Sequence, residues 1–104
     1  MRLSSKILVL KEAALDLDTG RDFYDRKEPG LGDYFWDSLI SDLESLMIFS
    51  GVHEKHHGFH RMPAKRFPYA VYYTVEDDTT YIVAVLPMLR NPVWLEQMLE
   101  KRDV

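Results

Sequence analysis

The sequence predicts an α+β domain in which a helical hairpin packs on a small antiparallel sheet, in the order β-α-α-β-β-β-α. Three observations predict this class. Apolar residues recur at helical spacing in the first half of the chain, strict alternation begins at Tyr69, and glycine-containing or acidic breaks separate the segments. A length of 104 residues is typical of one domain, so residues 1–104 are expected to form a single unit.

The first two predicted elements are a short strand and a long helix. The aliphatic run Lys6–Leu10 indicates the strand. The charged segment Lys11–Glu28 follows, and its apolar residues lie near helical spacing. Gly20 weakens this helix by about 1 kcal/mol relative to alanine. The apolar positions are Ala13, Ala14, Leu17, Phe23 and Tyr24.

A second helix follows the break at Glu28–Gly32. We expect Asp33 to cap its start and Ser50-Gly51 to end it. Its apolar residues recur every four positions and form a stripe that is wide enough to face a core. The short connection between the two helices predicts an antiparallel hairpin. The stripe contains Leu31, Phe35, Leu39 and Leu43, widened by Trp36, Ile40 and Met47.

The last part of the chain predicts three strands and a helix. Phe59–Lys65 fits a strand that Pro63 interrupts, and Tyr69–Val75 alternates with a period of two. After a turn at Glu76–Thr79, the nearly all-apolar segment Tyr81–Leu86 predicts a central strand covered on both faces. Asn91 as cap and Pro92 at the first helical position predict a final helix over Val93–Arg102.

All four histidines lie between Gly51 and His60, and His53–His57 matches the zinc-hydrolase pattern H-E-x-x-H. The two histidines of this pattern can bind one zinc ion only when a helix places them on the same face. The segment between Gly51 and Gly58 is shorter than two helical turns, and it lies where a predicted helix is followed by a predicted strand. We therefore interpret the segment as a solvated basic loop and expect neither a metal site nor a cofactor.

Composition describes an ordinary globular protein with one basic region. Net charge is −4, yet residues 51–70 carry four Lys or Arg against one Asp or Glu. The chain has no cysteine, which excludes disulfides and thiolate zinc sites. We find no secretory signal and no apolar stretch long enough to cross a bilayer, so we expect a cytoplasmic protein that does not bind membranes.

The basic region supplies the candidate functional residues, which are Arg61, Lys65, Arg66 and, beyond the last strand, Arg90. Gathered on one concave face, such cations would suit a phosphate backbone or a developing phosphorane. The alternative is that they are solvated edge residues, which deter aggregation. No strong general base is evident, although His60 is possible beside Arg61.

The segment His60–Leu95 resembles the final strands of the RelE/ParE toxin superfamily, the toxic halves of bacterial type II toxin–antitoxin modules. The order and spacing of its motifs carry the resemblance, which extends over nearly the whole chain. The motifs are R-F-P-Y-A-V-Y-Y at Arg66–Tyr73 and R-x-P at Arg90–Pro92, with Asp16-Leu17, Phe23-Tyr24 and P-G-L-G at positions 29–32 upstream.

The resemblance implies a small bacterial, often plasmid-stabilising protein that is neutralised by a tightly bound antitoxin. RelE-like members cleave mRNA on the ribosome without a metal, whereas ParE-like members inhibit DNA gyrase. Carried over, Arg61, Lys65, Arg66 and Arg90 fall where basic functional residues are expected. Many relatives have a histidine or second arginine before the R-x-P arginine, but here Pro87–Leu89 precede it. Some ribonuclease members carry a tyrosine near the C-terminus that is absent here, and the pI is near 5.5.

Three hypotheses follow. The first is a ParE-like toxin that inhibits gyrase, the second a RelE-like ribosome-dependent endoribonuclease, and the third a non-toxic homologue that only binds an antitoxin. None requires direct sequence-specific DNA binding. We expect the antitoxin to dock as an extended or helical segment on apolar surface around Trp94 and Trp36.

Overall fold

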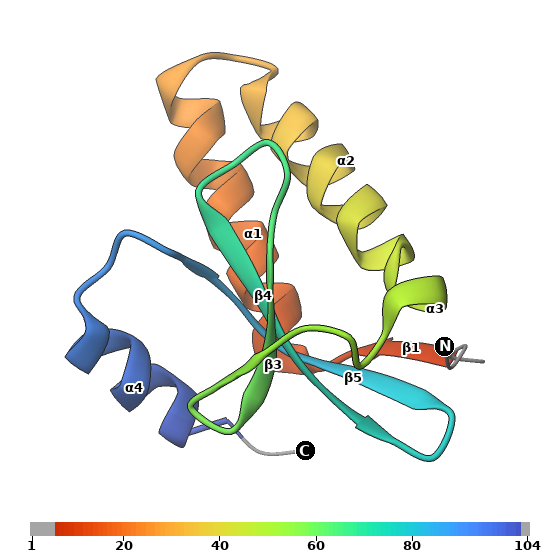
Figure 1. Cartoon of the computed structure of the whole chain (residues 1–104). Coiled ribbons are helices and arrows are strands. Elements are labelled where there is room, and N and C mark those ends of the chain that lie inside the picture. Colours follow the sequence, from red (N-terminus) through yellow and green to blue (C-terminus); the bar gives the residue numbers. More distant parts are fainter. Residues whose placement is uncertain (1–5, 103–104) are drawn as a thin grey trace.

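The computed structural model describes residues 6–102, which form a helical hairpin, a five-stranded sheet and a C-terminal helix (Figure 1). The predicted fold class is confirmed. No helix among residues 6–102 is long and apolar enough to cross a membrane. The elements are β1 (Lys6–Val9), α1 (Lys11–Lys27), α2 (Leu31–Glu44), α3 (Leu46–Phe49), β2 (Lys55–His56), β3 (Phe59–Pro63), β4 (Tyr69–Glu76), β5 (Thr79–Pro87) and α4 (Pro92–Glu100).

The sheet has the strand order β1-β5-β4-β3-β2. β2, β3, β4 and β5 pair antiparallel through short connections. The last three of these strands were predicted, whereas β2 lies in a segment that was expected to be a loop. β1 joins in parallel beside the first half of β5, with Lys6 opposite Thr79 and Val9 opposite Ile82. The whole helical hairpin lies between these two strands in sequence, which is long enough for a parallel crossover. Because β1 ends at Val9, no strand among residues 6–102 pairs with this edge of β5 beyond Ile82.

Close approach of α1 and α2 depends on glycine. An added Cβ on Gly20 would lie 2.5 Å from Cζ of Phe35, so the helices meet where Gly20 has no side chain. Gly20 is buried and serves this contact, whatever it costs in helix propensity. The hairpin therefore brings the ring of Phe35 into the core between helix and sheet.

The prediction that Asp33 caps α2 is wrong. Gly30 occupies the cap position with a φ of 92°, and Asp25 of α1 accepts hydrogen bonds from the N–H groups of Gly30 at 3.0 Å and Gly32 at 3.3 Å. Asp33 lies in the first turn and pairs instead with Arg21. The capping oxygen thus comes from the preceding helix, since the tight connection brings Asp25 beside the start of α2.

The predicted second helix is divided at Ser45, whose hydroxyl donates to the carbonyl of Asp42 at 2.6 Å. The short helix α3 then continues to Phe49. Met47, predicted to widen the apolar stripe, lies on α3 with its side chain exposed. The final helix begins as predicted, with the Asn91 side chain accepting from the N–H of Val93 at 2.8 Å.

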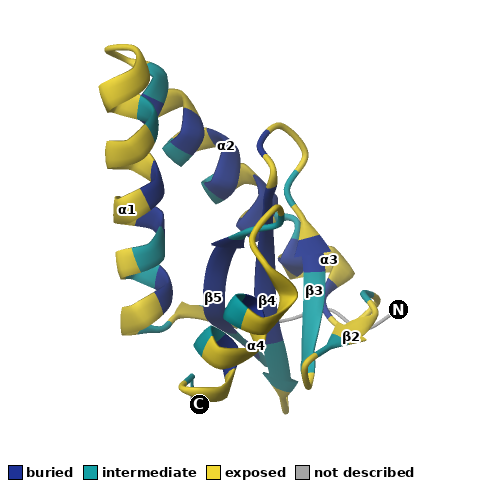
Figure 2. Ribbon diagram, turned by 90° about the vertical axis from the view of Figure 1, so that its left-hand side faces the viewer, coloured by how far each residue is buried: buried dark blue, intermediate teal, exposed yellow. Residues whose placement is uncertain are grey.

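The sheet separates two apolar cores, as the alternation of β4 and β5 requires (Figure 2). The larger core lies under α1, α2 and α3 and includes Val71, Tyr73 and Ile82. The smaller core lies under α4 and includes Tyr72 and Ala84, together with Leu95 and Leu99 of that helix. β5 is therefore covered on both faces, as predicted.

Candidate functional site

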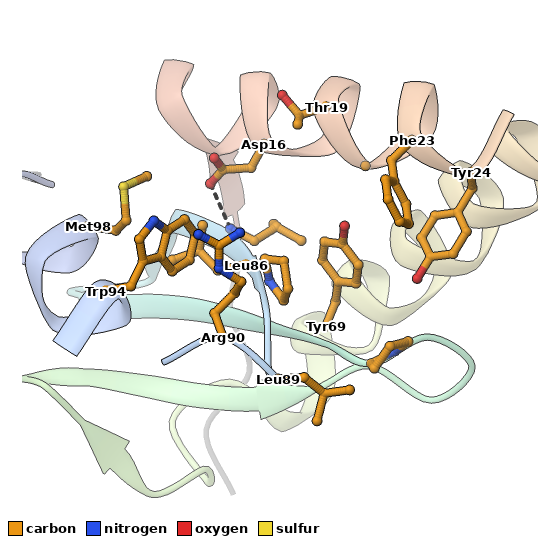
Figure 3. Close-up of a pocket in the computed structure, with 14 residues that line it drawn as sticks. Asp16, Thr19, Phe23, Tyr24, Tyr69, Leu86, Leu89, Arg90, Trp94 and Met98 are labelled. Atoms are coloured by element: carbon orange, nitrogen blue, oxygen red, sulfur yellow. Dashed lines mark hydrogen bonds between the residues drawn. The ribbon is translucent and has the colours of Figure 1, made fainter. Parts of the chain in front are cut away.

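A cleft of about 520 Å³ opens between α1, the unpaired edge of β5 and the start of α4 (Figure 3). Its walls are mostly apolar and aromatic, and it is large enough for several side chains of a partner. α1 contributes Asp16, Thr19, Gly20, Phe23 and Tyr24, the start of β4 and the residue before it contribute Tyr69 and Pro68, and Val85–Pro87, Leu89, Arg90, Trp94 and Met98 complete the lining.

Asp16, which lines the cleft, forms an ion pair with Arg102. The guanidinium donates to both carboxylate oxygens, at 2.8 and 3.0 Å, and also to the carbonyl of Val83 at 2.9 Å. Asp16 accepts a further bond from the N–H of Val85 at 2.9 Å. Both side chains are largely buried, at 7% and 13% exposure for Arg102 and Asp16. Together they satisfy backbone groups that a neighbouring strand would otherwise bind.

The other charged group of the cleft is Arg90, in the connection between β5 and α4. Its guanidinium carbon lies 4.0 Å from the centre of the Trp94 ring, within the range of a cation–π contact (Figure 3). Arg90 is exposed, whereas Trp94 is half-buried against the smaller core. Of the residues predicted from sequence, the structure brings these two together.

The floor of the cleft carries two tyrosine hydroxyls that stay uncharged at neutral pH. Burial raises the pKa of Tyr69 to about 12, helped by neighbouring Tyr24 and Asp16, and burial also raises the pKa of Tyr24. Their rings lie 6.2 Å apart and pack with Phe35, which joins the cleft floor to the larger core. The cleft therefore offers neutral hydrogen-bonding groups on an apolar base.

The remaining predicted cations lie on other parts of the fold. Arg61 stands opposite Tyr72 in the register, so it belongs to the face of the sheet that α4 covers. β3 ends at Pro63, and the alternation of faces does not continue to Lys65, whose N–H donates to the Asp42 carboxylate at 3.2 Å. Arg66 is exposed in the connection between β3 and β4.

His60 faces the helical side of the sheet. Its ring stacks on Tyr73 at 5.0 Å between centroids, and its Nδ1 lies 2.6 Å from the carbonyl oxygen of His53. The Nδ1 of His53 in turn lies 2.6 Å from the Tyr73 hydroxyl oxygen, which accepts from the N–H of Gly51 at 2.9 Å. His53, His60 and Tyr73 thus form a packed network with the segment that follows α3.

The histidine segment is a hairpin rather than a helix. Lys55 pairs with His60 and His56 with Phe59, so β2 and β3 are joined by the two residues His57 and Gly58. Both have positive φ, 55° and 86°, as the tightest hairpin turns require. His53 and His57 therefore do not project from one helical face, and residues 6–102 contain no group of three His, Cys, Asp or Glu placed to hold a metal ion.

Trp36 lies apart from the cleft. It is half-buried on α2 against the larger core, and Arg21 of α1 lies over its ring at 5.3 Å. Sequence reasoning missed Arg102 and gave Asp16 no role in the site. A signal for Asp16 was present, because it sits at helical spacing among Ala13, Leu17 and Gly20, all buried. A carboxylate among buried positions needs a hydrogen-bond or charge partner, but the sequence pattern does not indicate which residue that partner is.

The chain thus places a helical hairpin on one face of a mixed sheet and a C-terminal helix on the other. No family model and no curated protein matches the sequence significantly. A chain of the chromosomal ParDE toxin–antitoxin system from P. aeruginosa matches with a TM-score of 0.72 and 17% identity, over 82% of this chain and 96% of that chain. At this identity the likeness establishes the shared fold.

Proposed function

We propose that the chain is the toxin of a type II toxin–antitoxin module and arrests growth when free of its antitoxin. The observation that carries this proposal is the likeness in fold to a chain of the ParDE system, nearly all of which is covered. The motif order of the last strands, from Arg66 to Pro92, supports it independently. Such a toxin acts in the bacterial cytoplasm and needs no cofactor.

We further propose a ParE-like action, in which the toxin inhibits DNA gyrase by protein contact. A net charge of −4 disfavours an enzyme that must enter the ribosome beside mRNA. The only histidine proposed for acid–base work, His60, is stacked on Tyr73 with its Nδ1 bonded to a backbone carbonyl. Neither feature hinders a toxin that binds a protein target.

Ribosome-dependent mRNA cleavage is a second candidate, favoured by Arg61. Within the part of the chain that the structure describes, Arg61 forms no ion pair, so its guanidinium is available to a phosphate. In that mechanism Arg61, Lys65, Arg66 and Arg90 would stabilise the charge that develops during cleavage.

Inducible expression with and without the adjacent gene tests the proposal. Growth arrest that the neighbouring product relieves is the expected result, and absence of arrest would identify a non-toxic homologue. Purified protein is then assayed for gyrase supercoiling and for mRNA cleavage on programmed ribosomes. Loss of supercoiling supports the ParE-like action. Cleavage that falls in Arg61→Gln but persists in Lys55→Gln, with supercoiling intact, would replace it with the RelE-like one.

A further inference from the structure

A second pocket, of about 360 Å³, lies beside the junction of α2 and α3 and shares no lining residue with the cleft beside α4. That junction is at the end of α2 remote from its connection to α1 (Figure 1). Met62 of β3 forms part of the pocket wall and belongs to the larger core, so the pocket lies on the helical face of the sheet. We call it the Asp42 pocket, after the acid that lines it.

The carboxylate of Asp42 is the most enclosed charge of this pocket, since the residue is 3% exposed. Its Oδ2 accepts from the N–H of Lys65 at 3.2 Å, and its Oδ1 accepts no hydrogen bond from residues 6–102. No fully buried side-chain oxygen in that range lacks a partner, so Oδ1 keeps a small area in contact with solvent. Because Asp42 lines the pocket, that area opens into it.

No cation among residues 6–102 neutralises Asp42. The ion pairs in that range involve other acids, and Lys65 binds Asp42 through its backbone N–H without forming an ion pair. His53, which also lines the pocket, is uncharged at neutral pH, because burial and the nearby His60 lower its pKa. A largely buried carboxylate without a countercharge is costly, so the pocket favours a cationic occupant.

The single open oxygen suits an ammonium better than a guanidinium. A guanidinium binds a carboxylate best through both oxygens, but the Oδ2 of Asp42 is already bound to the backbone of Lys65. An ammonium is a compact charge that can bind one oxygen strongly and a weaker acceptor beside it. Ser45 offers that second acceptor, because its hydroxyl donates its proton to the Asp42 carbonyl at 2.6 Å and keeps its lone pairs.

Exposed apolar side chains border the Asp42 pocket. Phe49 and Val52 line it and are 47% and 62% exposed, and Met47 and Ile48 of α3 are exposed as well. The methylene stem of a lysine can pack on such a surface while its charge reaches the acid. Large apolar side chains gathered on one short segment are typical of a surface that contacts another protein. The surroundings therefore favour a lysine presented by a protein over a free amine, which would leave these side chains in water.

We propose that the Asp42 pocket binds a lysine side chain of a partner protein. The ammonium contacts the Oδ1 of Asp42 and the hydroxyl of Ser45, and the methylene stem lies on Phe49 and Val52. Binding at this pocket does not depend on whether the chain arrests growth.

Selection from displayed peptide loops tests the occupant. The full-length chain selects from short disulfide-closed loops in which the central position is Lys, Arg, Gln or Glu and the flanking positions vary. Loops that also bind the Asp42→Asn variant are discarded, which removes binders of other surfaces. The remaining loops are expected to carry a central Lys beside large apolar residues. Lys should be favoured over Gln by roughly tenfold, the effect of one charged hydrogen bond.

Three variants locate the binding of a selected loop by titration. Glu44→Gln removes an exposed acid from the same helix and should leave the affinity unchanged. Lys65→Gln should raise the affinity by roughly twofold, because a like charge is removed from the pocket. Phe49→Ser, at an exposed position, should lower the affinity by roughly fivefold through lost apolar contact.

Two controls separate binding from folding. Asp42→Asn keeps an oxygen for the N–H of Lys65, and its thermal unfolding transition is compared with that of the unaltered chain. A loop that carries Nε-acetyl-lysine repeats the test without a change in the protein and should bind roughly tenfold more weakly. Equal binding of the lysine and acetyl-lysine loops, selection of a central Arg or Glu, or weaker binding to Lys65→Gln would refute the proposal. Spermine that binds as tightly as the selected loops would overturn the protein partner.

Discussion

Asp16 and Arg102, 86 positions apart in sequence, form a two-pronged ion pair that fastens the end of the chain to the first helix. The pair also binds the backbone of Val83 and Val85, so it replaces a strand at the edge of β5. Arg102 thereby ties the end of α4 to α1 and β5, while Asn91 caps the start of the helix.

Removal of either partner should destabilise the fold strongly. Asp16→Ala leaves the Arg102 cation and the Val85 N–H without their acceptor in a largely buried place, and a loss of about 3–5 kcal/mol is expected. Equilibrium urea unfolding measures it. Arg102→Met should cost a similar amount. In the double variant Asp16→Leu with Arg102→Met the loss should be smaller than the sum of the single losses, because no buried charge is left unpaired. Strict additivity would contradict the role of the pair.

Gly20→Ala should destabilise the protein, although alanine is the better helix former. The new methyl group would lie 2.5 Å from Cζ of Phe35, and forcing it into this contact should cost about 1–3 kcal/mol. Thr19→Ala, at the exposed neighbouring position, should be neutral or slightly stabilising in the same unfolding assay. Adding Phe35→Leu to Gly20→Ala should relieve the clash, so that the double variant loses less than the two single losses combined. A stabilised Gly20→Ala would show that helix propensity decides at this position.

The elements could be predicted from sequence because their signals are local. Helical spacing in α2, alternation in β4 and the Asn91-Pro92 start of α4 each depend on residues a few positions apart. The parallel placement of β1 and the Asp16–Arg102 pair could not be predicted, because each joins segments separated by most of the chain. The prediction that Asp33 caps α2 was wrong for the same reason at shorter range. The oxygen that accepts from the start of α2 belongs to Asp25, on the neighbouring helix.

The candidate site was predicted in part. Arg90 and Trp94 are close in sequence, one before and one inside the first turn of α4, and the structure brings them together. The rest of the cleft comes from α1, from the start of β4 and from β5, and its shape depends on where β1 stops. No periodicity in the sequence reports that a strand is missing at an edge, so the cleft itself was not predictable.

The His57-Gly58 turn predicts opposite outcomes for two substitutions. Gly58 has a φ of 86° with no neighbouring atom within 4 Å of an added Cβ, so Gly58→Ala should cost about 1–2 kcal/mol through backbone strain alone. His57→Asn should keep or slightly raise stability, because asparagine followed by glycine suits this turn. Thermal unfolding of the two variants tests the assignment. Equal losses would mean that the hairpin does not contain this turn.

Stability should fall as the pH falls from neutral toward 5, because of His53. Burial lowers the pKa of His53 below its ordinary 6.5, and the nearby His60 lowers that pKa further. Near pH 6.5, His53 therefore binds a proton in the unfolded chain but stays neutral in the folded chain. The free energy of unfolding decreases as the pH falls from about 6.5 to the lower pKa of His53 in the folded chain. Protonation would also make the Nδ1 of His53 a hydrogen-bond donor toward the Tyr73 hydroxyl oxygen. That oxygen already accepts a hydrogen bond from the N–H of Gly51.

Urea unfolding at several pH values from 7.5 to 5 measures this slope, in steps of about half a pH unit. His53→Asn, which keeps a polar side chain but does not titrate, should flatten the curve over this range. His57→Asn removes an exposed histidine from the same hairpin and should leave most of the slope in place. A slope that survives His53→Asn unchanged would assign the proton uptake to another group and contradict the role of the half-buried His53 beside Tyr73.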